Sequence, residues 1–127
     1  MKKLLTLSLI GFFPFMLSAQ KVLKYHFKNK KEYILQKDQW DKPSLADARF
    51  VINFKNNTVE KIVDGLDAKI FSITRTIEGT DNETLEDCQL IQLEGGAYRI
   101  VLYKREERGL RFIQKEGPIV AYYNSGK

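Results

Sequence analysis

The chain has 127 residues and a formal net charge of +5; 29% of its residues are charged and 43% are apolar. These proportions exclude a disordered, collagen-like or disulfide-framework protein, and the length allows one domain with one hydrophobic core. One Cys and one His supply neither a zinc ligand set nor a Cys–His catalytic pair. We therefore expect no enzymatic activity.

The N-terminus has the three-part layout of a secretory signal peptide. Two lysines precede an apolar run at 4–17, and Ser18-Ala19 follows as the cleavage region. The run is shorter than the roughly 20 apolar residues that a spanning helix needs, and it contains Pro14. We expect cleavage after Ala19. A single domain, 20–127, would then be exported to the periplasm or the cell exterior, with no transmembrane segment.

The composition of the exported part favours strands. Ile, Val, Thr and the aromatic residues make up 33 of the 108 residues from Gln20 onward. Branched and ring side chains pack well on a pleated sheet and lose rotamer freedom in a helix. The composition thus predicts an all-β fold.

The first strands are predicted from short apolar alternations separated by turn residues. Strands are expected at 22–27 and 32–36, joined by a turn at 28–31. The polar connection 37–47 follows, and Ser44 can cap a single helical turn within it.

The segment 49–63 is predicted to form a hairpin. Apolar and polar residues alternate on both sides of Asn56-Asn57, a pair that tolerates the positive φ of a two-residue turn. Such a turn pairs Phe54 with Val59 and Phe50 with Val63. The next strand is expected at 69–77, followed by a polar stretch at 78–87.

A second hairpin is predicted around Gly95-Gly96, with strands at 88–94 and 97–104. Its turn pairs Leu93 with Tyr98, Ile91 with Ile100, and Leu90 with Val101. Both faces are apolar, so we expect the core on one side and a loop or second sheet layer on the other.

Strands at 109–115 and 118–123 complete the prediction. The count is about nine strands in one antiparallel meander, curled into a barrel or folded as a sandwich.

The charges are unevenly distributed along the chain. Segment 20–49 carries 8 basic and 4 acidic residues, whereas 78–94 carries 6 acidic and no basic residues. The basic residues proposed as a contact side are Lys24, Lys28, Lys30 and Lys31. A solvated face is the ordinary interpretation of such residues, and a nucleic-acid surface is disfavoured in an exported protein. The partner that fits best is an anionic envelope component, either a membrane or a polysaccharide.

Three further features of the sequence bear on chemistry. The acidic residues of 78–87 match no EF-hand spacing, and we expect a solvated loop rather than a calcium site. His26 is expected to be structural or exposed. Cys88 is expected to be a small buried hydrophobic residue, the alternatives being intermolecular pairing or a reactive thiol. We expect neither a metal nor a cofactor.

The run Arg49-Phe-Val-Ile-Asn-Phe-Lys-Asn-Asn-Thr-Val, with the closing Gly109-Leu-Arg-Phe-Ile and Ala121-Tyr-Tyr-Asn, carries a family likeness. Over about residues 49–123 the chain resembles small exported β-sheet proteins of Gram-negative bacteria. That resemblance implies a β-sheet fold and supplies no catalytic residues. Lipocalins are similar in size and strand number, but their Gly-x-Trp in the first strand is absent here.

The function expected from the sequence is an exported, non-catalytic binding or envelope-interaction module. The alternative is a lipocalin-like carrier of a small molecule. The interior distinguishes the two, because a small barrel filled by its own side chains has no room for cargo. The aromatic residues expected to fill it are Phe50, Phe54, Phe71, Tyr98 and Phe112.

Overall fold

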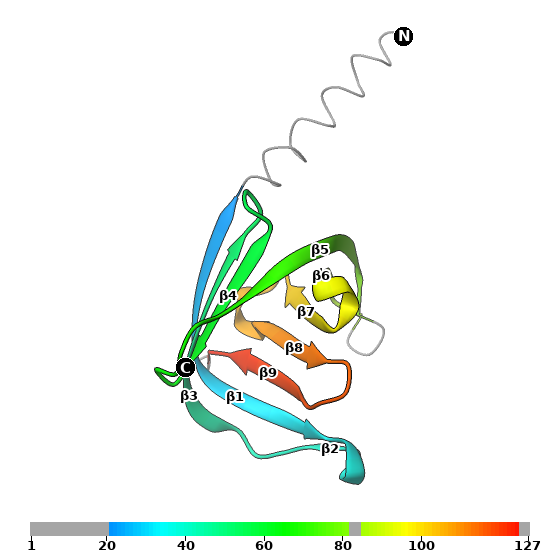
Figure 1. The fold of residues 1–127 in the computed structure, drawn as a ribbon. Helices are drawn as coiled ribbons and strands as arrows, with labels where there is room; N and C mark the ends of the chain where they lie inside the picture. The colour runs from blue at the N-terminus through cyan, green and yellow to red at the C-terminus, as the bar shows by residue number, and fades with distance from the viewer. Residues whose placement is uncertain (1–20, 82–84, 125–127) are drawn as a thin grey trace, which may run out of the picture.

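The structure, a computed structural model, describes residues 21–81 and 85–124 (Figure 1). The predicted signal peptide lies outside the described residues. Among those described there is no α-helix; three short 3₁₀ turns accompany nine strands. The strands are β1 (Val22–Ile34), β2 (Gln39–Trp40), β3 (Ser44–Asn53), β4 (Thr58–Val63), β5 (Lys69–Thr80), β6 (Asp87–Leu93), β7 (Tyr98–Tyr103), β8 (Leu110–Gln114) and β9 (Ile119–Tyr123).

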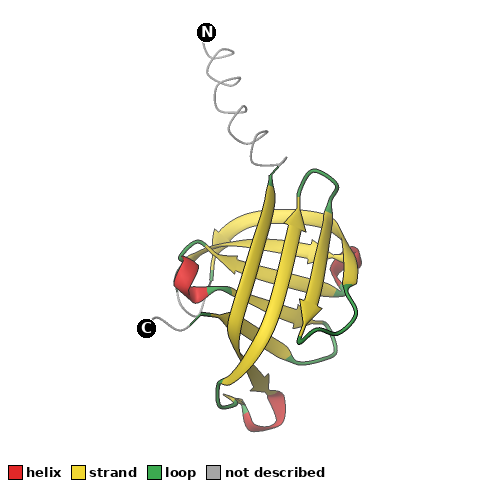
Figure 2. Cartoon of the chain, turned by 90° about the vertical axis from the view of Figure 1, so that its left-hand side faces the viewer, coloured by secondary structure: helices red, strands yellow, loops and turns green. Residues whose placement is uncertain are grey.

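The nine strands form an antiparallel meander that closes on itself. From β3 to β9 each strand pairs with the next along the chain, and β1 pairs with both β3 and β9. Eight strands thus close a barrel, and the short β2 adds to the end of β1. The all-β prediction is confirmed, and of its two architectures the barrel is the one formed. In Figure 2 the wall made by β1, β3 and β4 faces the viewer.

The first strand is longer than predicted. The turn expected at 28–31 is wrong, because β1 runs without interruption through it. Its register with β3 shifts between Phe27 and Asn29; beyond the shift β1 pairs with β3 for two more residues and begins to pair with β9 on its other edge. At this bulge the Lys28 N–H donates to Asn124 Oδ1 at 2.9 Å, and Asn124 Nδ2 donates to the His26 carbonyl at 3.1 Å. A bulge bends a strand without ending it. The polar residues at 28–31 are compatible with a bulge as well as with a turn, so their composition did not distinguish the two.

Two predictions about the next segment are also wrong. The helical turn at Ser44 is instead the start of β3, where neighbouring β1 supplies ladder partners. The hairpin pairs Ile52 with Val59 and Phe50 with Lys61, two residues away from the predicted register. The Asn53 side chain accepts the Asn56 N–H at 3.0 Å, which favours a four-residue loop. Because strand periodicity is two, this shift leaves every side chain on its predicted face.

The second hairpin is confirmed. Leu93 pairs with Tyr98, Ile91 with Ile100, and Leu90 with Val101. Strand β5 extends to Thr80, so the start of the predicted acidic loop is strand. Part of that loop, 82–84, lies outside the described residues.

The barrel interior is filled by aromatic rings and branched side chains. Phe112 is 1% exposed, and its ring centroid lies 5.5 Å from that of Phe71, 5.7 Å from Tyr98 and 6.5 Å from Phe50. Phe50 and Phe71 are buried, while Phe54 and Tyr98 are partly buried against them. The five aromatic residues expected inside therefore pack on the core.

Candidate functional site

An aromatic and basic cluster lies on the outer face of the barrel, where β1 meets β2 and β9. Register fixes which side chains point outward. Lys30 is opposite Tyr122, which is buried in the core, so the next residue, Lys31, points outward opposite Ala121. Arg111 is opposite the same Ala121 from the other side. Six residues form what we call the outer cluster: Lys31, Tyr33, Trp40, Tyr103, Arg111 and Tyr123.

Two cations face the Trp40 ring in the outer cluster. Lys31 Nζ lies 5.1 Å from the ring centroid and Arg111 Cζ lies 4.9 Å from it. Tyr33 packs on Trp40 edge to face, with centroids 5.5 Å apart. The distances of Lys31 and Arg111 from the Trp40 ring are both within the range in which a cation is attracted by the ring quadrupole. The sequence places Trp40 here because β2 pairs Trp40 directly with Tyr33.

The cluster continues towards β7. Lys31 Nζ is 6.0 Å from the Tyr123 ring, and Arg111 Cζ is 5.7 Å from the Tyr103 ring. A shallow depression of about 190 Å³ lies between these side chains. Glu107 and Arg108 also line it, so the depression has three basic residues and one acidic residue.

Acidic neighbours position one side of the cluster. The Tyr103 hydroxyl donates to Asp81 Oδ2 at 2.5 Å, and burial followed by this hydrogen bond raises the pKa of Tyr103. Arg108 Nε lies 2.9 Å from Glu86 Oε2. Lys31, in contrast, has only ring contacts among the described residues. Its charge is therefore the one most open to an anionic ligand.

An apolar groove of about 330 Å³ adjoins the outer cluster on the outer face of β5 to β9. Arg111 lines both the groove and the 190 Å³ depression. Neither the loop nor the second sheet layer predicted to cover this face is present in the part of the chain that the structure describes; the face is a groove instead. Its apolar lining residues are Ile77, Leu90, Val101, Ile113 and Ile119.

Cys88 also lines this groove and is 7% exposed, which confirms the expectation of a buried cysteine. Burial, followed by the negative charges of Asp81 and Asp87, raises the pKa of the Cys88 thiol. A raised pKa keeps the thiol protonated near neutral pH and therefore a poor nucleophile.

The four lysines proposed from the sequence do not form one patch. Lys24 and Lys28 are exposed on the first half of β1. Lys30 points to the inner side at the barrel end, with Nζ 4.0 Å from Asp64 Oδ2. Lys31 alone joins the outer cluster. The strand bulge separates them, because it reverses the in–out alternation halfway along the run.

His26 has a structural partner on the surface. Its Nε2 is 2.6 Å from Asp47 Oδ1, and both side chains are about half exposed. The hydrogen bond to His26, with a further contribution from Arg49, lowers the pKa of Asp47. No group of three or more His, Cys, Asp or Glu side chains among the described residues is arranged to hold a metal ion.

Five members of the outer cluster were not proposed from the sequence. They come from β1, β2, β7, β8 and β9, and barrel closure brings them together. One sequence feature could have indicated the cluster. Trp40, the only Trp of the chain, lies in a predicted polar connection, where a large ring is not expected to fill the core.

Comparisons with protein families, curated proteins and solved structures gave no match. Within the described residues, no helix has the length and apolar character to cross a membrane.

Proposed function

We propose that this protein is an exported, non-catalytic binding module that contacts an anionic component of the cell envelope through the outer cluster. The observation that carries the proposal is the placement of Lys31 and Arg111 against the Trp40 ring. Export and the absence of catalysis rest on the sequence, through the signal peptide and the missing catalytic groups.

The chemistry of the cluster suits a phosphate or carboxylate group attached to a larger molecule. A guanidinium binds such groups with directed hydrogen bonds, and an ammonium adds a compact charge. The aromatic rings hold both cations beside a flat apolar surface, against which a sugar ring or a lipid glycerol can pack. A phospholipid headgroup and an acidic polysaccharide share this chemistry.

Binding can be followed through Trp40, which is the only Trp of the chain. The probes are phosphatidylglycerol vesicles, phosphatidylcholine vesicles and a carboxylated polysaccharide. We expect a change in Trp40 fluorescence with an anionic probe at low salt and a weaker one at high salt, because exposed charges are screened. The two anionic probes distinguish lipid from polysaccharide.

A charge-matched pair of variants tests the site. Lys31→Glu with Arg111→Glu should weaken binding by at least about tenfold, through the loss of two charge-assisted contacts. Lys24→Glu with Lys28→Glu makes the same change in net charge on the other half of β1 and should change binding less than about threefold. Equal losses in both variants, or binding of neither anionic probe, would overturn the proposal. Urea unfolding of each variant checks that the fold is kept.

The lipocalin-like carrier is less well supported. A carrier of that kind needs an enclosed cavity, and the rings of Phe50, Phe71 and Phe112 occupy the interior. This packing is why the proposal places binding on the surface. Native mass spectrometry of protein purified from its own host tests the alternative, since a small molecule bound in stoichiometric amount would favour the carrier.

A further inference from the structure

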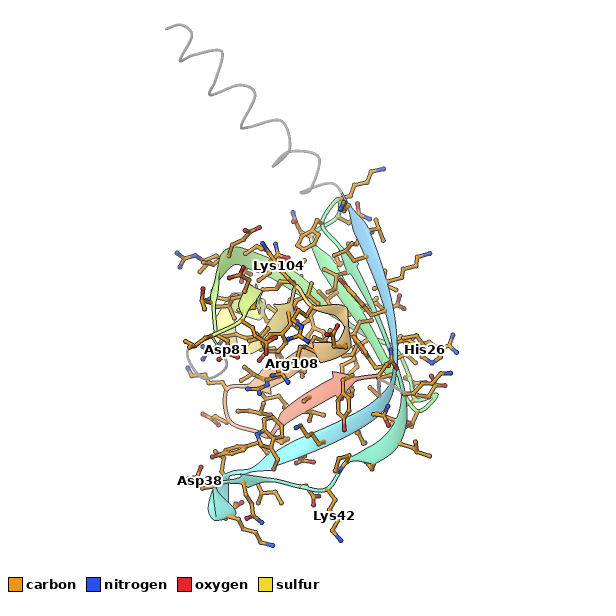
Figure 3. All side chains as sticks on the ribbon, turned by 180° about the vertical axis from the view of Figure 1, so that it is seen from behind. His26, Asp38, Lys42, Asp81, Lys104 and Arg108 are labelled. Carbon is orange, nitrogen blue, oxygen red and sulfur yellow. The ribbon has the colours of Figure 1, made fainter. Side chains whose placement is uncertain are left out.

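The first half of β1 has a strand along only one of its edges. Strand β3 pairs with β1 over Val22–Phe27 and beyond, whereas β9 pairs with it only from Asn29 to Tyr33. No other described strand pairs with the second edge of Val22–Phe27. The barrel is therefore closed at one end of β1 and open beside the other (Figure 3).

Hydrogen bonds show which backbone groups face this open edge. The Lys21 carbonyl accepts the Phe54 N–H at 2.9 Å, so the odd-numbered residues direct their backbone groups to β3. The His26 carbonyl and the Lys28 N–H point the opposite way, to Asn124. Alternation then directs the N–H and C=O groups of Val22 and Lys24 to the open edge, and they have no backbone partner among the described residues.

A groove of about 470 Å³ runs beside this edge. Its apolar lining comes from Leu23, Tyr25, Phe27 and Leu102, and its charged lining from Lys21, Lys24, Lys104 and Glu78. Lys104 and His26, which both line it, are labelled in Figure 3 on its two sides. The groove thus combines unpaired backbone, an apolar surface and an excess of positive charge.

We propose that the open edge of β1 binds an extended peptide segment of another protein as an added strand, and that the segment alternates apolar and acidic residues. Backbone donors and acceptors on a sheet edge are matched by the backbone of an extended peptide. Successive side chains of such a peptide point to opposite faces. One set then packs on the apolar lining near Leu102, and the other meets Lys24 and Lys104.

A second copy of this chain fits the edge less well. Two β1 edges paired antiparallel would bring Lys24, His26 and Lys28 of one copy beside the same residues of the other. Like charges opposite each other destabilise a strand pair. The lysines thus oppose self-association and favour an acidic partner.

The test uses a short synthetic peptide of alternating Val and Glu, with a peptide of the same composition in blocked order as control. Amide hydrogen exchange of the purified protein should slow about tenfold or more at Val22 and Lys24 when the alternating peptide is added, and not with the control. The same peptide N-methylated at alternate residues should not protect these amides, because it lacks the donors that an added strand needs.

Two variants at one position separate backbone from charge. Lys24→Pro removes the N–H that faces the open edge and none that pairs with β3, so the barrel ladder is kept. It should weaken peptide binding about tenfold or more. Lys24→Gln keeps the N–H and should weaken binding only about twofold to threefold.

Several results would overturn the proposal. These are unchanged exchange at Val22 and Lys24 with the alternating peptide, equal protection by the blocked control, or equal binding by a folded Lys24→Pro variant. Protection that grows with protein concentration and without peptide would also overturn it, since that result assigns the edge to a second copy. If Lys24→Pro does not fold, exchange in the unmodified protein and the N-methylated peptide still decide.

Discussion

The contact between Lys61 and Phe112 is a charged group placed against the aromatic core. Lys61 belongs to β4 and is opposite Phe50, on the inward face of the hairpin. Its Nζ lies 4.1 Å from the centroid of the Phe112 ring. Partial burial, followed by the positive charges of Lys69 and Lys30, lowers the pKa of Lys61. The ring therefore attracts a charge that its surroundings disfavour.

The size of this attraction follows from the burial of the pair. Cation–ring contacts contribute about 0.5–1 kcal/mol at exposed sites and about 2 kcal/mol when desolvated. Lys61 is partly buried and the ring is almost fully buried. We expect a coupling free energy of about 1 kcal/mol between the two side chains.

A double-mutant cycle measures that coupling. Lys61→Met keeps the apolar stem and removes the charge, and Phe112→Leu removes the ring and keeps an apolar core residue. The free energy of unfolding in urea, followed by Trp40 fluorescence, is compared for the unmodified protein, both single variants and the double variant. Costs of altered core volume cancel when the single variants are subtracted. A coupling energy within about 0.3 kcal/mol of zero would refute the reasoning.

The pH dependence of the cycle provides a second check. Because the pKa of Lys61 in the folded protein is lowered below its ordinary value of 10.5, the cost of keeping it charged is fully present below the folded pKa and disappears as pH rises from there to 10.5. The stability difference between Lys61→Met and the unmodified protein should change over that same range. No change there would contradict the assigned burial of the ammonium group.

Three other predictions concern stability and reactivity. Burial, followed by the negative charges of Asp64 and Glu32, raises the pKa of Tyr122 to about 12. Its contribution to stability should therefore be complete below the ordinary tyrosine pKa of 10 and lost as pH rises from 10 to 12. Alkaline unfolding should show this loss, and Tyr122→Phe should remove it. Gly109 has φ +70°, and a Cβ there would overlap the Tyr122 backbone, whereas Gly95 has φ +72° and open space around it. Gly109→Ala should therefore lower the free energy of unfolding by more than the about 1–2 kcal/mol expected for Gly95→Ala. Equal shifts in Tm for the two variants would contradict this. Cys88 should react with a thiol reagent much more slowly in the folded protein than in urea, and equal rates would show that it is not buried.

The sequence predicted those parts of the fold that depend on local pattern. Strand periodicity located β3 to β9, although it divided β1 in two and missed β2. Gly95-Gly96 set the register of the second hairpin, because a tight turn between two alternations leaves little freedom. The first hairpin was displaced because the Asn53 side chain binds within the turn and lengthens it. The bulge after Phe27 was missed because a lysine-rich run has no residue that distinguishes a bulge from a turn.

The candidate site was less predictable for a different reason. Lys31 and Arg111 are 80 positions apart in the chain, and they approach only because β9 lies between β1 and β8. Clustering along the chain selected four neighbouring lysines, but alternation and the bulge direct them to different surfaces. Spatial neighbours from the two ends of a closed sheet leave no local pattern for sequence analysis to find.

The pairing of β1 with β9 also determines when this protein can finish folding. Asn29 and Tyr123, which are partners in the ladder, are separated by 94 positions, so closing the barrel joins the start of the domain to its end. Contacts between distant positions slow folding. During synthesis the growing chain must wait, with the edges of β1 and β8 uncovered, until its final strand has emerged. Deleting β9 would thus leave an open sheet with two exposed edges rather than a smaller barrel, and such a chain should aggregate and depend on chaperones.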